Sequence, residues 1–150
     1  MGRAEAARGV RRLARRLVGT IEPGIESTHD FEVDGPLLTD VGGTLEFSVL
    51  STPGMIAMME RTAAMLVFPE LPEGKATVGF EVCVRHVASA QAGSRCTSRA
   101  RLEEVLDGRK LRFSVEVLRE DGRTIGVGTH ERRVIDTSPP SIDTSPPSRS

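Results

Sequence analysis

The sequence has few cysteines, no long hydrophobic run and almost no net charge, and each of these shortages excludes a class of protein. With a formal net charge of −1, the chain lacks the excess of basic residues that is typical of nucleic-acid-binding proteins. Its strongly apolar runs, residues 55–59 and 63–68, fall far short of the about 20 residues that span a bilayer. We therefore expect neither nucleic acid nor a membrane as a partner.

The small number of cysteines also limits the covalent chemistry. Cys83 and Cys96 can form at most one disulfide, and they do not make a metal-type C-x-x-C pair. The arginine-rich start of the chain lacks the apolar block of a secretory signal. These features predict reduced thiols and a cytoplasmic protein.

A chain of 150 residues has room for a single hydrophobic core. Residues 1–26 form a basic extension whose apolar residues share one helical face, so we expect it to be partly helical, either solvated or in contact with an anionic surface. Residues 137–150 belong to a Ser/Pro-rich segment in which the sequence IDTSPP occurs twice. Such sequence cannot bury a core, so we expect a disordered tail. The globular domain is expected between them, over residues 27–136.

Within this domain the pattern changes from strand to helix. Residues 28–33 alternate like a strand, and the glycine-rich residues 34–43 read as a loop. Thr52 followed by Pro53 is a helix-start signal, with Thr52 as the expected N-cap, and Pro69 ends the segment. The segment is apolar on nearly every side, which predicts a buried helix.

The residues after the helix predict an antiparallel sheet. Two hairpin signals, Asp107-Gly108 and Asp121-Gly122, separate runs of alternating polarity. One such run places Val78, Phe80, Val82, Val84 and His86 on one face. An antiparallel sheet wrapped around one long central helix is the α+β hotdog fold. This fold leaves a sheet edge and a helix flank uncovered, which favours a homodimer.

Glu60 is the most informative residue, because it is the only carboxylate between Pro53 and Pro69. Burying an unpaired carboxylate costs several kcal/mol, so the position requires a partner or a raised pKa. Glu60 is either a surface residue whose side chain reaches solvent or a general base or nucleophile that points into a cleft.

His86 and Thr52 each allow a structural and a functional interpretation. His86 ends the apolar face of its strand, so it is either a satisfied core residue or a partner of Glu60. Thr52 is either only a cap or a group that, with the adjacent backbone N–H groups of Gly54 and Met55, holds a carbonyl oxygen or oxyanion.

The spacing of the candidate residues bears on how they would meet. Thr52 and Glu60 are eight residues apart, which places their backbones roughly 12 Å apart along a helix. Two antiparallel helices across a dimer axis would bring Thr52 of one chain to Glu60 of the other. We therefore expect an active site at the subunit interface.

Three segments resemble the fluoroacetyl-CoA thioesterase family of hotdog enzymes. They run from Thr52 to Glu60 (TPGMIAMME), from Val78 to His86 (VGFEVCVRH) and from Gly128 to Arg132 (GTHER), and the similarity covers about residues 27–136. The resemblance implies hydrolysis of a small acyl-CoA thioester to the free acid and coenzyme A, without a metal or other cofactor. It implies a catalytic trio of Thr52, Glu60 and His86, with Gly79 beside the acyl group and Arg132 at the acyl end.

Other interpretations remain open at this stage. The family's lid segment is rich in phenylalanine, whereas residues 41–50 contain a glycine pair and only Phe47, so the resemblance does not imply fluoroacetyl specificity. A non-catalytic acyl-CoA-binding protein would keep the same pocket without needing a buried acid, and a hotdog hydratase is a third candidate. Arg95, Arg99 and Arg101 share one strand face, which either holds coenzyme A phosphates or is simply solvated.

Overall fold

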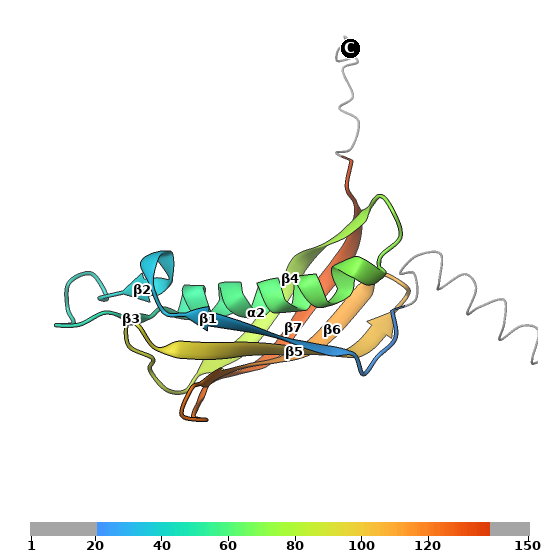
Figure 1. The fold of residues 1–150 in the computed structure, drawn as a ribbon. Coiled ribbons are helices and arrows are strands. Elements are labelled where there is room, and N and C mark those ends of the chain that lie inside the picture. Colours follow the sequence, from blue (N-terminus) through green and yellow to red (C-terminus); the bar gives the residue numbers. More distant parts are fainter. Residues whose placement is uncertain (1–20, 139–150) are drawn as a thin grey trace, which may run out of the picture.

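The structure is a computed structural model that describes residues 21–138. Most of the predicted basic extension and of the predicted tail, residues 1–20 and 139–150, lies outside the described residues. Figure 1 shows one long helix lying along one face of a sheet. The elements are β1 (Glu26–Glu32), η1 (Gly35–Leu37), β2 (Leu38–Thr39), β3 (Val49–Leu50), α2 (Thr52–Val67), η2 (Phe68–Glu70), β4 (Lys75–His86), β5 (Arg95–Leu106), β6 (Lys110–Arg119) and β7 (Thr124–Asp136).

The main sheet has five strands in the order β1-β5-β6-β7-β4, and neighbouring strands are antiparallel. Both predicted hairpins are present. Asp107 and Gly108 have φ angles of 54° and 62°, and Gly122 has a φ angle of 85°, which are the left-handed values that tight turns require. The predicted α+β architecture, one long helix on an antiparallel sheet, is confirmed.

The helix is buried on one side only. Met55, Met59, Ala63 and Val67 recur at four-residue spacing and are all inaccessible to solvent, packed against the sheet. On the other side Met65 is 57% exposed and Phe68 is 54% exposed. The expectation of a helix buried all round is therefore wrong for a single chain, because one sheet covers only one flank of a helix.

The start of α2 also differs from the prediction by one residue. Ser51, rather than Thr52, is the N-cap, and its hydroxyl accepts a hydrogen bond from the Gly54 amide at 2.9 Å. Ser and Thr are both good caps and Pro53 fits either of the first two helical positions, so the sequence pattern alone did not distinguish them. The side chain of Thr52 is consequently free for another contact.

A β-bulge interrupts β4 where the sequence shows unbroken alternation. Gly79 pairs with Arg132 and Glu81 pairs with Glu131, so Phe80 is an extra residue without a partner. The bulge reverses which side chains face the helix. As a result Val78 and Phe80 are 44% and 60% exposed, and their predicted place on the same face as His86 is wrong.

The packed part of the chain begins before residue 27. Ile21 is only 6% exposed and belongs to the core, and the Gly24 amide donates to the Leu102 carbonyl at 2.7 Å. The core therefore includes residues that the sequence pattern assigns to the basic extension. Within residues 21–138, no helix is long and apolar enough to cross a membrane.

Two glycines of β7 let other elements approach closely, and their replacement makes a matched pair. A Cβ at Gly128 would overlap the Cys83 carbonyl and the Val84 Cα of β4, whereas one at Gly126 would overlap the flexible end of Met55. We expect Gly128→Ala to lower the free energy of unfolding by about 3 kcal/mol or more and Gly126→Ala by about 1–2 kcal/mol. Urea unfolding of both variants measures the difference, and equal losses would contradict the assignment of a rigid backbone neighbour at Gly128.

Candidate active site

Thr52 and His86 meet within one chain. Thr52 is the first residue of α2 and His86 is the last residue of β4. Thr52 Oγ1 and His86 Nδ1 are hydrogen-bonded at 2.9 Å. The other ring nitrogen, His86 Nε2, is buried and has no hydrogen-bond partner within residues 21–138, which is uncommon for a buried polar atom. Burial lowers the pKa of His86, and a backbone contact to Ala88 opposes that effect.

The backbone amides of Gly54 and Met55, next to Thr52, already donate hydrogen bonds within the chain. Gly54 N donates to the Ser51 hydroxyl at 2.9 Å and Met55 N donates to the Ser51 carbonyl at 2.9 Å, while Pro53 has no N–H. Met55 is fully buried in the core. Within the described residues both amides therefore donate to Ser51 and the Thr52 hydroxyl contacts His86, so a substrate-binding role for Gly54 and Met55 stays a prediction.

Glu60 lies at a second cluster, beside Gly79 and His130. A Cβ added at Gly79 would lie 3.1 Å from Glu60 Oε1 and 3.6 Å from His130 Cε1. The half-buried carboxylate thus fits against the bare backbone of β4, just before the bulge. Glu60 also interacts electrostatically with Arg132, the residue that pairs with Gly79. The carboxylate of the apolar helix α2 therefore lies near the positively charged guanidinium of Arg132.

Arg132 is held in place by Thr77 and His130. Its Nε donates to Thr77 Oγ1 at 2.8 Å, its Nη2 donates to the Thr77 carbonyl at 3.0 Å, and its Nη1 lies 3.2 Å from His130 Nε2. Arg132 is only 7% exposed. Burial lowers the pKa of Arg132, and the charge of Glu60 opposes that effect. Arginine nevertheless stays protonated in proteins, so a positive charge is buried here.

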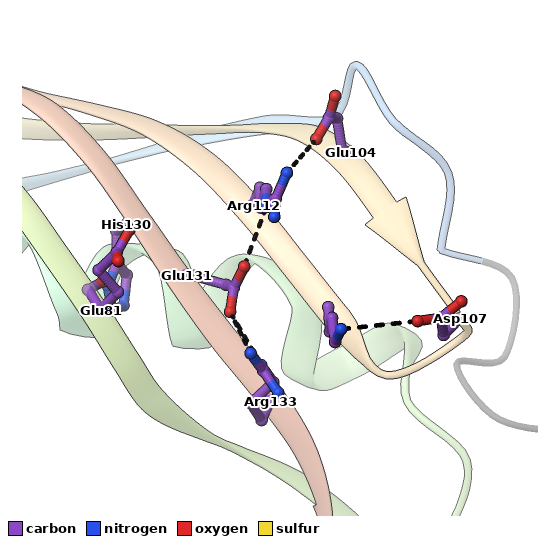
Figure 2. A network of polar contacts seen from close by, with 8 residues as sticks. Glu81, Glu104, Asp107, Arg112, His130, Glu131 and Arg133 are labelled. Atoms are coloured by element: carbon purple, nitrogen blue, oxygen red, sulfur yellow. Dashed lines mark hydrogen bonds and ion pairs between the residues drawn. The ribbon is translucent and has the colours of Figure 1, made fainter.

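The opposite face of β7 carries a chain of ion pairs, which Figure 2 shows across the sheet. Arg112 bridges Glu104 at 3.2 Å and Glu131 at 2.9 Å, and Glu131 also pairs with Arg133 at 2.7 Å. Arg133 in turn lies over the Phe80 ring at 3.7 Å. Because side chains alternate along a strand, this network fixes β7 from outside while His130 and Arg132 point inward.

The two clusters are separate within one chain. Gly79 and His86 are seven residues apart on β4, a distance of roughly 20 Å along a strand. Thr52 and Glu60 lie on one uninterrupted helix, roughly 12 Å apart along its axis. The structure therefore pairs His86 with Thr52, and it does not bring Glu60 to His86 inside a single chain.

Two arginines of the β5 stripe, Arg99 and Arg101, are paired with carboxylates. Arg99 pairs with Glu26 at 3.0 Å and with Glu116 at 3.5 Å, and Arg101 pairs with Glu103 at 3.3 Å. These arginines lie on the outer side of the sheet, and exposed pairs of this kind stabilise the fold little. The geometry favours a solvated face over a site for phosphates.

Sequence reasoning gave too little weight to His130 and missed Thr77. By its sequence, His130 in the GTHER segment is at least as consistent with a structural role as with a functional one, although it shares its strand face with Arg132 two residues later. That i, i+2 spacing was the available signal. The sequence contains no comparable signal for the hydrogen bonds of Thr77 to Arg132, because the bulge in β4 decides which face of the sheet Thr77 occupies.

The comparisons with known proteins agree with this architecture. A model of the fluoroacetyl-CoA-specific thioesterase family matches residues 36–138. The fluoroacetyl-CoA thioesterase of Streptantibioticus cattleyicolor is 35% identical over 119 residues, which are 75% of this chain and 84% of that protein. The L-carnitine dehydrogenase/betainyl-CoA thioesterase of Agrobacterium fabrum is 30% identical over 124 residues, which are 79% of this chain and 24% of that longer protein.

Comparison with solved structures indicates the same class of protein, the thioesterases. The fluoroacetyl-CoA thioesterase FlK superposes with a TM-score of 0.70 at 30% identity, covering 77% of this chain and 89% of that one. A thioesterase superfamily member from Thermus thermophilus gives 0.70 at 30% identity, covering 77% and 85%. The fold is thus the hotdog fold of the thioesterase superfamily. Within that class, the chain belongs to the fluoroacetyl-CoA-specific thioesterase family.

The contact between Gly79 and Glu60 gives a test of the second cluster. An alanine methyl at position 79 would be tight against Glu60 Oε1, so the carboxylate must shift by a few tenths of an ångström. Gly79 does not have a left-handed φ, so the backbone accepts alanine. We expect Gly79→Ala to fold normally and to lower thioesterase turnover about 10-fold, because small misplacements of a reacting group are costly. Steady-state kinetics and thermal unfolding of the variant check this, and unchanged turnover would contradict a role for this contact.

Proposed function

We propose that the protein hydrolyses a small acyl-CoA thioester to the free acid and coenzyme A. The observation that carries the proposal is the family match over residues 36–138, which includes Thr52, Glu60 and His86. The two curated relatives are named as thioesterases of fluoroacetyl-CoA and of betainyl-CoA. The acyl group differs between those relatives, so we propose the reaction class and leave the acyl chain to a substrate panel.

We further propose that the catalytic groups come from two chains of a homodimer. Two features support this: β4 is an edge strand of the described sheet, and α2 and the adjoining η2 expose Met65 and Phe68 on the flank that the sheet does not cover. A second copy that packs its helix antiparallel to the first would cover this flank. It would also bring Glu60 of one copy toward the Thr52–His86 pair of the other.

In this arrangement Glu60 acts as the general base that activates water. The Thr52 hydroxyl, oriented by His86, binds the thioester carbonyl while the water oxygen attacks its carbon. As the C–S bond breaks, the imidazole passes the proton that Glu60 took from water to the leaving sulfur of coenzyme A. Gly79 and Arg132 line the acyl end of the site. Attack on the carbonyl by Glu60 or by Thr52 is the alternative, and mass spectrometry would identify the nucleophile as the residue that carries a covalent acyl group. We place the protein in the cytoplasm, where Cys83 and Cys96 would remain the free thiols that they are in the structure.

Replacement of Glu60 tests the reaction. Glu60→Gln removes the proposed base but keeps the size of the side chain, so we expect an intact fold and turnover lowered by at least about 100-fold. Release of the coenzyme A thiol measures turnover, and acyl-CoA binding is measured in parallel by calorimetry. Near-normal hydrolysis by the variant would remove Glu60 from the mechanism. Binding without any hydrolysis by the wild-type protein would instead identify a non-catalytic acyl-CoA-binding protein.

Mixing of inactive variants tests the shared site. A heterodimer of a Thr52→Ala chain and a Glu60→Gln chain keeps one site with both residues intact, so activity should return to about half of the wild-type sites. A heterodimer of Thr52→Ala and His86→Gln chains is the matched control, because Thr52 and His86 contribute to the same half-site of one chain. That control should stay inactive.

Thiol release by verified heterodimers, measured after co-refolding against the unmixed variants, distinguishes the outcomes. Equal recovery in both mixtures would show that Thr52 and His86 belong to different sites. No recovery in the first mixture would contradict a site composed from two chains.

A further inference from the structure

The imidazole of His130 is fixed from three directions. Its ring stacks on Phe113 of β6 with centroids 6.1 Å apart and an interplanar angle of 28°. Its Nδ1 lies 2.8 Å from the Glu81 carbonyl of β4, and its Nε2 lies 3.2 Å from Arg132 Nη1. His130 is only 2% exposed. The proposed trio of Thr52, Glu60 and His86 does not include this histidine.

The neighbours of His130 determine which nitrogen carries the proton. The guanidinium of Arg132 can only donate, so Nε2 must accept. The Glu81 carbonyl can only accept, so Nδ1 must carry the proton. Both contacts demand the same neutral tautomer. Burial and the charge of Arg132 hold the pKa of His130 below its ordinary value, while the Glu81 carbonyl and Glu60 oppose them.

Arg132 depends on this acceptor for one of its two terminal nitrogens. Thr77 binds Nε and Nη2, whereas the hydrogen bond from Nη1 goes to His130. Three of the five N–H groups are thereby used, and the other two bond to none of the residues that the structure describes. The imidazole, which Phe113 and Glu81 hold in place, therefore sets the direction of the two remaining N–H groups together with Thr77.

The arrangement lies next to the reacting acid. Gly79 is the backbone partner of Arg132, and its missing Cβ leaves room for both Glu60 Oε1 and the His130 ring. A carboxylate as the acceptor for Arg132 would neutralise the guanidinium. A neutral imidazole binds the guanidinium without neutralising it, so the positive charge remains available on the side of Glu60 and the acyl group.

We propose that His130 is a positioning residue: as a neutral acceptor it orients the Arg132 guanidinium at the acyl end of the site. This inference rests on the proposed function, because the effect is read through hydrolysis. His130 does not touch the reacting atoms; it acts through Arg132.

Two substitutions separate the two hydrogen bonds of His130. The amide of Gln extends to about the position of Nε2 and can accept from Arg132, whereas the shorter amide of Asn reaches about the position of Nδ1 and can donate to the Glu81 carbonyl. We expect His130→Asn to lower kcat/KM about 10- to 100-fold, the scale of a lost hydrogen bond to a charged group, and His130→Gln to stay within about 3-fold of wild type. Equal loss in both variants would overturn the proposal.

A double-mutant cycle supplies a readout that a purely structural role would not change. In an Arg132→Met background, His130→Asn should cause no further loss of kcat/KM, because the group that it positions is already gone. Losses that multiply independently would show that His130 acts without Arg132 and would overturn the proposal. Thermal unfolding of each variant accompanies the kinetics, and if His130→Asn does not fold, His130→Phe, which keeps a ring next to Phe113 but cannot accept from Arg132, takes its place in the cycle.

The outcomes of the two proposals are distinguishable. Absence of hydrolysis by the wild-type protein would remove the proposed function before any variant is compared. Wild-type hydrolysis that is lost in Glu60→Gln, together with full activity in His130→Asn, would keep the proposed function and overturn only the role of His130.

Discussion

The packing of α2 against the sheet is the contact on which the rest of the molecule depends. Met55 and Met59 press toward β7 at Gly126, where the absence of a side chain leaves room for them. This contact sets the height of the helix above the sheet and the rotation of the helix about its axis. Once both are fixed, the positions of Thr52 and Glu60 relative to β4 follow, because a helix is rigid over this length.

From this constraint two polar clusters result, one toward each end of β4. Thr52 and His86 join the start of the helix to the end of the strand, and Glu60 lies against Gly79 near the strand's bulge. The two clusters are separate because roughly 12 Å of helix lies between Thr52 and Glu60. A second copy of the chain is the simplest way to combine the two clusters, and it would also cover the exposed flank of α2.

The two faces of β7 serve different purposes. On the outer face, Glu131 links Arg112 and Arg133 in a network that holds the strand in register (Figure 2). On the inner face, Arg132 is buried against Thr77 and His130. A buried cation is costly to keep, and hydrogen bonds to neutral groups lower that cost without removing the charge. The strand thus presents a charged group to the site while its own position is fixed from the other side.

The sequence by itself determined the elements and most of their pairing. The Pro53 start signal, the apolar helix and the two Asp-Gly turns are local features, so they gave the helix and the antiparallel sheet correctly. Glu60 stood out because one carboxylate in an apolar helix is a local anomaly. The tertiary structure decided what depends on several elements at once. The bulge at Phe80 reversed the faces of Val78 and Gly79, because pairing with β7 and not local alternation sets the register there. The choice of Ser51 as the cap, the pairing of His86 with Thr52 and the contacts of His130 likewise arise only where segments distant in sequence meet, and no periodicity along one strand encodes them.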